Sequence, residues 1–218
     1  MLMLNNLIGF GAGGDAALAS IVQQASATST AATLTAPADI VSGDLLIFSD
    51  LATNIGLPAS VVPTGFTSLS SVSGGNNQRC ITSYKIADGS EASATITGMD
   101  GNLSDRKVMV TFRGNVPFAT ASPNTWGGVN QITNPTAQTV TASGGTPPLI
   151  VFGVYGCADA AVDPRTFSTT KDGEVSQGTN LYVAWKIYMS SPADTDVDMD
   201  DEGGSFQNSL QSGYIALT

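Results

Sequence analysis

A partial repeat between the two halves of this chain is the feature that most constrains its fold. Four landmarks recur in the same order: residues 43–48 match 147–152, residues 63–68 match 164–169, residues 84–86 match 185–187, and Phe112 matches Tyr214. The second and third landmarks share an offset of 101 residues, and the first has an offset of 104. Because these offsets are far longer than the unit of a solenoid, the repeat predicts two homologous halves.

The pattern of apolar residues predicts short β-strands and almost no helix. In the first half, strands are expected at 31–35, 44–49, 66–72, 79–86, 92–97 and 107–113, with turn residues between them. Alternation is clearest in the last strand, where Val108, Val110 and Phe112 share one face. One short helix is expected at 15–24, where Asp15 would cap its N-terminus. Many short strands of this kind are typical of a sandwich or a barrel.

The second half contains an unbroken apolar run at 149–155, which predicts a strand covered on both faces. We therefore expect the two halves to complete one core within a single all-β antiparallel sandwich, with two small sandwiches, one for each half, as the alternative. The expected boundaries are an N-terminal region at 1–28 and a sandwich at 29–218, which divides into a first half at about 30–115, a crossover loop at 116–135 and a second half at about 136–218. A loop of this length is expected to pass from one sheet or edge to another.

The charge of the chain excludes several classes of partner. The net charge is −10, and no Lys or Arg precedes Arg79. A nucleic-acid partner would require a basic surface, so none is expected. An anionic membrane surface is disfavoured for the same reason, and no apolar run approaches the roughly 18 residues of a membrane span. The N-terminus lacks a basic region before its apolar residues, so no general secretion signal is expected.

Catalytic and metal-binding residue types are scarce. The chain has no His and only two Cys, which removes the Ser-His-Asp and Cys-His arrangements and leaves too few ligands for a tetrahedral metal site. A pair of carboxylates could act as in glycosidases, but nothing distinguishes two of the 18 acids. We expect no enzymatic activity. Cys80 and Cys157 are expected to be small core residues, with one bridge between the halves as the alternative.

The N-terminal arm, residues 1–14, is a feature that the repeat does not contain. It combines a Gly-rich hinge at 9–14 with apolar side chains that need to pack against protein: Met1, Met3, Leu4, Leu7, Ile8 and Phe10. These side chains either pack on their own domain or anchor the chain in a neighbouring subunit or larger assembly. The hinge matches G-x-G-x-x-G, but no strand precedes it and no βαβ unit surrounds it, so a dinucleotide site is not expected.

An acidic segment and a tryptophan are the other features that are not repeated. Four acids alternate with Thr195, Val197 and Met199, and on a strand they would share one face: Asp194, Asp196, Asp198 and Asp200. The segment is interpreted as an edge strand protected by charge, and Ca²⁺ binding is the alternative. Trp126 lies in a Gly-rich loop, where it either packs or contacts a ligand such as a sugar. Trp185 shares a face with Val183 and Ile187 and is expected in the core.

Several motifs, in order, carry a resemblance to a known family. They are G-D-L-L-I at 43–47, P-T-G-F-T at 63–67, Y-K-I-A-D-G-S-E at 84–91 and V-T-F-R-G at 110–114. Over about residues 30–218 this order resembles the β-sandwich proteins of phage virions and bacterial surfaces. The chain departs from their usual pattern at Phe66, where Trp is common, and in its acidic segment.

The resemblance implies a jelly-roll-like sandwich and supplies no catalytic residues. It implies a structural component of a tailed-bacteriophage virion, displayed on the head or tail as a decoration, cement or fibre-type protein. The expected partners are other capsid or tail proteins and further copies of the same chain, and the expected location is the extracellular particle. The alternative function is a carbohydrate-binding adhesin module that recognises a host-surface glycan, with Ca²⁺ as a candidate cofactor.

Overall fold

The computed structural model describes residues 20–53, 59–74, 78–100, 104–118, 126–131, 138–157, 165–199 and 208–217. The N-terminal arm, including its six apolar anchor candidates and the Gly-rich hinge, lies outside these residues. So does Asp200 of the acidic segment. No helix within the described ranges is long and apolar enough to cross a membrane.

Strands dominate both halves of the described chain. Those of the first half are β1 (Ile21–Ser29), β2 (Thr33–Thr35), β3 (Leu45–Thr53), β4 (Thr67–Gly74), β5 (Gln78–Ile86), β6 (Thr95–Thr97) and β7 (Ser104–Gly114). Those of the second half are β8 (Gly127–Gln131), β9 (Gln138–Val140), β10 (Leu149–Cys157), β11 (Arg165–Phe167), β12 (Gly173–Gln177), β13 (Leu181–Tyr188), β14 (Thr195–Met199) and β15 (Asn208–Ala216). A short 3₁₀ turn, η2 (Ala142–Gly144), follows β9.

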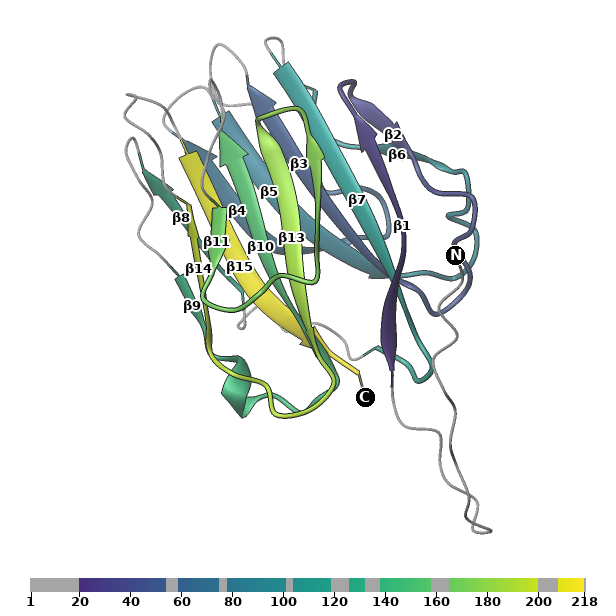
Figure 1. Cartoon of the computed structure of the whole chain (residues 1–218). Helices are drawn as coiled ribbons and strands as arrows, with labels where there is room; N and C mark the ends of the chain where they lie inside the picture. The colour runs from purple at the N-terminus through teal and green to yellow at the C-terminus, as the bar shows by residue number, and fades with distance from the viewer. Residues whose placement is uncertain are drawn as a thin grey trace, which may run out of the picture.

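Two five-stranded antiparallel sheets with matching strand orders form the body of the protein (Figure 1). The first sheet has the order β1-β7-β3-β5-β4, and the second has the order β8-β15-β10-β13-β12. Each half adds a small sheet, which is β2-β6 in the first half and β9-β14-β11 in the second. The protein is therefore an all-β sandwich of two related halves, as the sequence predicts.

Each half is rolled up in the manner of a jelly roll. In the first half the strand pairs are nested along the chain, with β1 on β7, β2 on β6 and β3 on β5. In the second half the same nesting pairs β8 with β15, β9 with β14 and β10 with β13. The nested pairs together form one long antiparallel hairpin. Because successive pairs belong alternately to the large and the small sheet, this hairpin is folded into two layers.

The two large sheets face each other across a central core to which both halves contribute. Leu45, Ile47 and Phe112 come from the first half, and Phe152 and Trp185 come from the second. A further core lies between each large sheet and its own small sheet. The halves thus share one core, as the apolar run at 149–155 predicts, and each also builds a second core of its own.

The strand register corrects two of the four sequence landmarks. Ile47 pairs with Tyr84, and Phe152 pairs with Trp185, so Ile47 and Phe152 occupy equivalent places at an offset of 105. The offset of 104 instead matches Phe152 to Phe48, which lies in the outer core of the first half. An error of one residue moves a side chain to the opposite face of a strand, so the alignment by composition is wrong here.

The match between Phe112 and Tyr214 is wrong for the same reason. Phe112 pairs with Leu45 in the central core, and the equivalent position in the second half is Ile215, which pairs with Ile150. Tyr214 packs against the outer core of the second half.

Two segments form strands where the sequence predicts other structure. Residues 21–24, expected in a short helix, begin β1 and pair with β7, because Ile21 and Val22 are β-branched and the pairing extends an existing sheet. Gly127–Gln131, expected within the crossover loop, forms β8 along β15. Gly128 permits this placement because it has no side chain, whereas a Cβ at this position would collide with Val72 of β4.

The G-D and R-G motifs of the first half meet in an ion pair. Asp44 is 1% exposed, and its two carboxylate oxygens accept hydrogen bonds from Nε and an NH2 nitrogen of Arg113, both at 2.7 Å. Asp44 also accepts a hydrogen bond from the backbone of Val41 at 2.9 Å. Gly43 precedes it with φ of +93°, a conformation that favours glycine. These motif residues therefore hold the start of β3 against the end of β7.

The Y-K-I-A-D-G-S-E motif closes the turn after β5. Glu91 is buried and accepts backbone hydrogen bonds from Asp88 and Gly89 at 3.2 and 3.1 Å. Lys85 forms ion pairs with both Asp88 and Glu91. Hydrogen bonds from Ser90 hold the pKa of Asp88 at about 2, below its ordinary value. The motif is thus explained by the local fold.

The Asp44–Arg113 pair predicts unequal effects of removing its two partners. Arg113→Ala leaves a buried carboxylate without its cation and is expected to lower the free energy of unfolding by about 3 kcal/mol or more. Asp44→Ala leaves a partly exposed guanidinium that water can solvate, and is expected to cost about 1–3 kcal/mol. Urea unfolding measures both.

Lys186→Ala is the matched control. Its ion pair with Asp172 is partly exposed, so its loss is expected to cost less than about 1 kcal/mol. We expect Arg113→Ala to lower the free energy of unfolding more than Asp44→Ala does. The opposite order would contradict the view that the buried charge of the Asp44 carboxylate is what requires a partner.

Candidate functional site

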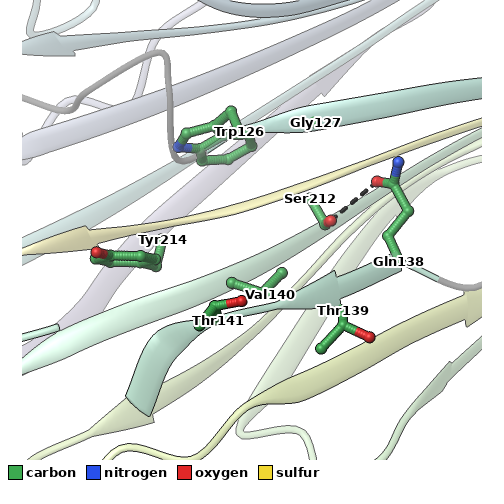
Figure 2. A pocket seen from close by; sticks show the side chains of 8 residues that line it. All are labelled: Trp126, Gly127, Gln138, Thr139, Val140, Thr141, Ser212 and Tyr214. Carbon is green, nitrogen blue, oxygen red and sulfur yellow. Dashed lines mark hydrogen bonds between the residues drawn. The ribbon is translucent and has the colours of Figure 1, made fainter. Parts of the chain in front are cut away.

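A cavity of about 370 Å³ opens where β8, β9 and β15 of the second half meet (Figure 2). Its lining combines two aromatic rings with amide and hydroxyl groups: Trp126, Gly127, Gln138, Thr139, Val140, Thr141, Ser212 and Tyr214. The lining residues come from segments almost 90 residues apart in the sequence. Because β15 pairs with β8 in the large sheet while β9 belongs to the small sheet, the cavity lies where the two sheets of this half diverge.

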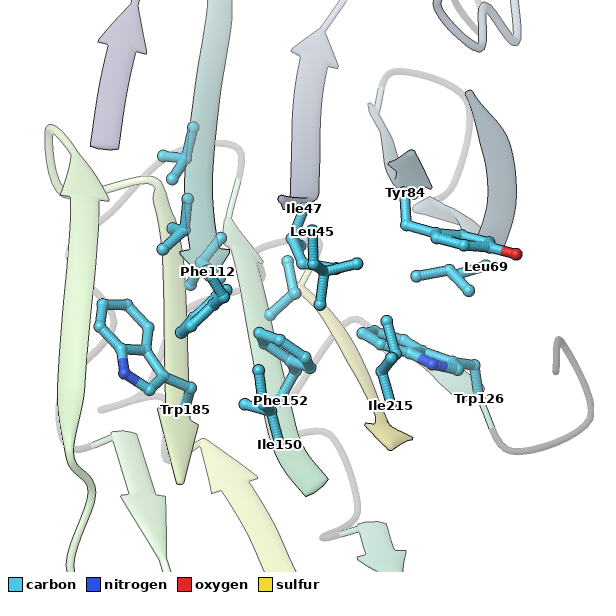
Figure 3. Close-up of a cluster of buried hydrophobic side chains, with 14 of the residues drawn as sticks. Leu45, Ile47, Leu69, Tyr84, Phe112, Trp126, Ile150, Phe152, Trp185 and Ile215 are labelled. Carbon is cyan, nitrogen blue, oxygen red and sulfur yellow. The ribbon is translucent and has the colours of Figure 1, made fainter. Parts of the chain in front are cut away.

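Trp126 forms one wall of the cavity from a buried position. It is 8% exposed and belongs to the central core, where its ring stacks on Phe152 with centroids 5.8 Å apart (Figure 3). A Cβ at Gly213 would collide with this ring, so the absence of a side chain there lets the indole lie on β15. Of the two expectations for Trp126, packing is confirmed. The indole Nε1 is buried, and no group among the described residues forms a hydrogen bond with it.

The polar wall of the cavity is partly organised by internal hydrogen bonds. Ser212 donates to Oε1 of Gln138 at 2.9 Å, and Thr139 donates to Asp196 at 2.6 Å (the first bond is drawn in Figure 2). Tyr214 presents a half-buried ring at the other end of the cavity. The arrangement offers an aromatic surface beside neutral donors and acceptors, which suits a small uncharged polyhydroxyl ligand.

Gln138, Ser212 and Tyr214 line the cavity without having been predicted as site residues from the sequence. Each lies on a strand and carries a common residue type, so no local motif marks it. The available signal was the alternation along β15, which places Ser212 and Tyr214 on one face, opposite Ile215 in the central core.

The acidic segment forms the central strand of its sheet, and its interpretation as an edge strand is wrong. β14 pairs with β11 on one side and with β9 on the other. The alternation itself is as expected, since Asp196 is exposed and Val197 is fully buried. The strand is central because, in the nested roll, it pairs with β9, the second strand of this half, along one edge and with β11 along the other.

Asp194, directly before β14, and Asp196 within it already accept hydrogen bonds from protein donors. Asp194 accepts a hydrogen bond from the backbone of Ser143 at 3.0 Å, and this interaction lowers its pKa. Asp196 accepts the bond from Thr139 noted above. Over the described ranges, which include Asp194, Asp196 and Asp198, no three His, Cys, Asp or Glu side chains are grouped closely enough to hold a metal ion.

Cys80 and Cys157 are both buried, and neither forms a disulfide. Cys80 belongs to the central core and Cys157 to the outer core of the second half, so the large sheet of that half lies between them. The bridge considered as an alternative is therefore not formed. Burial raises the pKa of Cys80 to about 12, which keeps its thiol protonated at neutral pH.

Comparison of the chain with protein-family models, with curated proteins and with solved structures finds no match. The function must therefore be argued from the fold and from the cavity.

The contact between Trp126 and Gly213 generates a test of this geometry. Gly213→Ala is expected to displace the indole, change the near-UV circular dichroism and lower the free energy of unfolding by about 1–3 kcal/mol, since it overfills a packed site. Gly144→Ala is the control, because a Cβ there meets no atom within 4 Å and should change stability by less than about 0.5 kcal/mol. An unchanged near-UV spectrum for Gly213→Ala would contradict the placement of Trp126.

Proposed function

We propose that this protein is a structural component of a tailed-bacteriophage virion, displayed on the head or tail as a decoration, cement or fibre-type protein. The observation that supports this proposal best is the tandem of two jelly rolls packed sheet to sheet. Jelly rolls recur in viral capsid proteins and in lectins, because a closed double layer gives a rigid body whose loops and edges remain free for contacts. The proposal includes location in the extracellular particle and no catalytic role.

The strand edges support association with other virion proteins and with further copies of the chain. β1 and β4 end the first large sheet, and β8 and β12 end the second. An edge strand can receive a strand from a neighbour. β1 carries Val22 with 50% of its surface exposed, together with the short hydroxyl side chains of Ser26 and Thr28. This edge suits a contact with a second copy or with a capsid or tail protein.

The proposal predicts a fixed copy number in purified particles. Quantitative mass spectrometry and immunogold microscopy on gradient-purified phage from the source culture should detect the chain at constant stoichiometry. A few copies per particle would place it in the tail, and hundreds would place it on the capsid. Its loss during gradient purification, with the major capsid protein as the internal standard, would contradict the proposal.

The N-terminal arm provides a separate test of attachment. A variant that lacks residues 1–14 is expected to remain a folded sandwich by circular dichroism but to fail to join particles. The control variant keeps the arm and carries Ser176→Ala, a change at an exposed position on β12. Full particle occupancy by the truncated chain would exclude the arm as the anchor without affecting the structural role.

The cavity beside Trp126 favours a second candidate function, carbohydrate binding by an adhesin module. Its aromatic and neutral polar lining is of the kind that sugars occupy. Because Trp126 also fills the central core, its replacement would disturb folding, so the informative variants are Gln138→Ala and Tyr214→Ala.

Glycan-array screening followed by calorimetry tests this function. Each of these two variants is expected to weaken binding at least about ten-fold, which corresponds to about 1.4 kcal/mol, while Ser176→Ala leaves it unchanged. Parallel titrations with EDTA distinguish a Ca²⁺-assisted site from a cation-independent one. An empty array, or equal affinity of all three variants, would remove the adhesin function.

A further inference from the structure

A lysine and an aspartate are buried together under the first small sheet. Asp50 of β3 and Lys107 of β7 are directly paired across neighbouring strands, and their side chains are 1% and 0% exposed. Lys107 Nζ lies 3.1 Å from Oδ1 of Asp50 and donates a hydrogen bond to the backbone oxygen of Met99 at 2.8 Å. The backbone of Gly98 and Met99 covers the pair, and a Cβ at Gly98 would collide with both side chains. Water is thus excluded from the two groups.

The fold does not require a charged pair at this place. By the register established above, the equivalents of Asp50 and Lys107 are Tyr155 and Leu210, which pair with each other in the second half. Both of these are fully buried in the outer core. The same position in the same topology is therefore filled by a tyrosine and a leucine, without an ion pair. A buried ion pair usually contributes less stability than apolar packing of equal volume. The pair in the first half calls for another explanation.

Burial favours the protonated form of the Asp50 carboxyl. It raises the pKa of Asp50 to about 6, against the opposing effects of the Lys107 charge and of the hydrogen bond that the Met99 backbone donates to Oδ2, and the nearby Asp105 adds a smaller upward effect. Oδ1 of Asp50 faces the Lys107 amine, and no other group among the described residues donates a hydrogen bond to it. Asp105 precedes Lys107 by two residues on β7 and so shares its face. Amide formation needs an amine beside a protonated carboxyl, which transfer of one proton from Lys107 to Asp50 within the pair would produce, and a second carboxyl nearby to carry protons.

We infer that Lys107 and Asp50 condense to form an intramolecular amide bond that links β7 to β3. The Nζ lone pair attacks Cγ of the protonated Asp50 carboxyl, and a bond forms between Nζ and Cγ. The bond from Cγ to one carboxyl oxygen then breaks, and that oxygen leaves as water with one proton that came from Nζ. Asp105 carries this proton from the nitrogen to the departing oxygen. The reaction requires no oxidant, reductant or cofactor.

The bond would link two neighbouring strands at the centre of the first large sheet covalently. β3 is the middle strand of the first large sheet and β7 is its neighbour, so the linkage closes residues 50–107 into a ring. A particle component exposed to mechanical load or proteases would gain resistance to unfolding from such a ring. The inference does not depend on the proposed virion role and is tested without a particle.

Intact mass spectrometry of the purified full chain, after denaturation, tests the inference directly. The wild type is expected to weigh less than its sequence mass by one water molecule. Trypsin should then yield a branched peptide that joins residues 1–79 to residues 107–113, because no Lys or Arg precedes Arg79 and the modified Lys107 is no longer cleaved. This peptide distinguishes the amide from a cyclised aspartate, which loses the same water without branching.

Three variants complete the test. Lys107→Arg keeps a cation and is expected to show its full sequence mass. The double variant Asp50→Leu with Lys107→Met replaces the ion pair with apolar side chains and serves as the unlinked control, with circular dichroism to verify that it folds. Asp105→Asn is expected to slow the loss of water in freshly refolded protein, and linkage at the wild-type rate would overturn its role in proton transfer. A folded wild type with its full mass and no branched peptide would show an ordinary ion pair and overturn the inference.

Discussion

The contact between the two five-stranded sheets is the interaction on which the rest of the structure depends. All nine residues of β3 and all nine of β10 are buried, so each of these central strands needs cover on both faces. The opposite half covers one face, and the small sheet of the same half covers the other. Separation of the halves would expose the whole central core to water. The protein therefore behaves as one body, although its topology is that of two successive jelly rolls.

The outer faces of the two large sheets carry different kinds of side chain at equivalent positions of the same topology. In the first half, Asp44 pairs with Arg113 where the second half places Leu149 beside Ala216. The buried Lys107 on the same face likewise has an apolar counterpart. The family-like motifs of the first half are thus structural, because their charged residues hold strand ends and turns in place.

Much of the architecture could be predicted because strand periodicity is a local property. The alternation of Val108, Val110 and Phe112 identified their common face, and all three are fully buried in the central core. Trp185 was assigned to the core by the same reasoning, and it packs edge to face against Phe112 at 5.4 Å between ring centroids. The candidate site could not be predicted in this way, since Trp126, Gln138 and Tyr214 meet only after β8, β9 and β15 have been brought together.

The all-β class, the duplication and the inward faces of the main strands could be predicted from the sequence, because they depend on residue type and on a period of two. The register between the halves, the central place of β14 and the burial of Trp126 follow from tertiary packing. Each of these depends on which strands become neighbours, and the nested pairing brings together residues about 25 to 93 positions apart. A shift of one residue in the pairing register moves every side chain of a strand to its opposite face. Which register is formed depends on the packing of the sheets against each other.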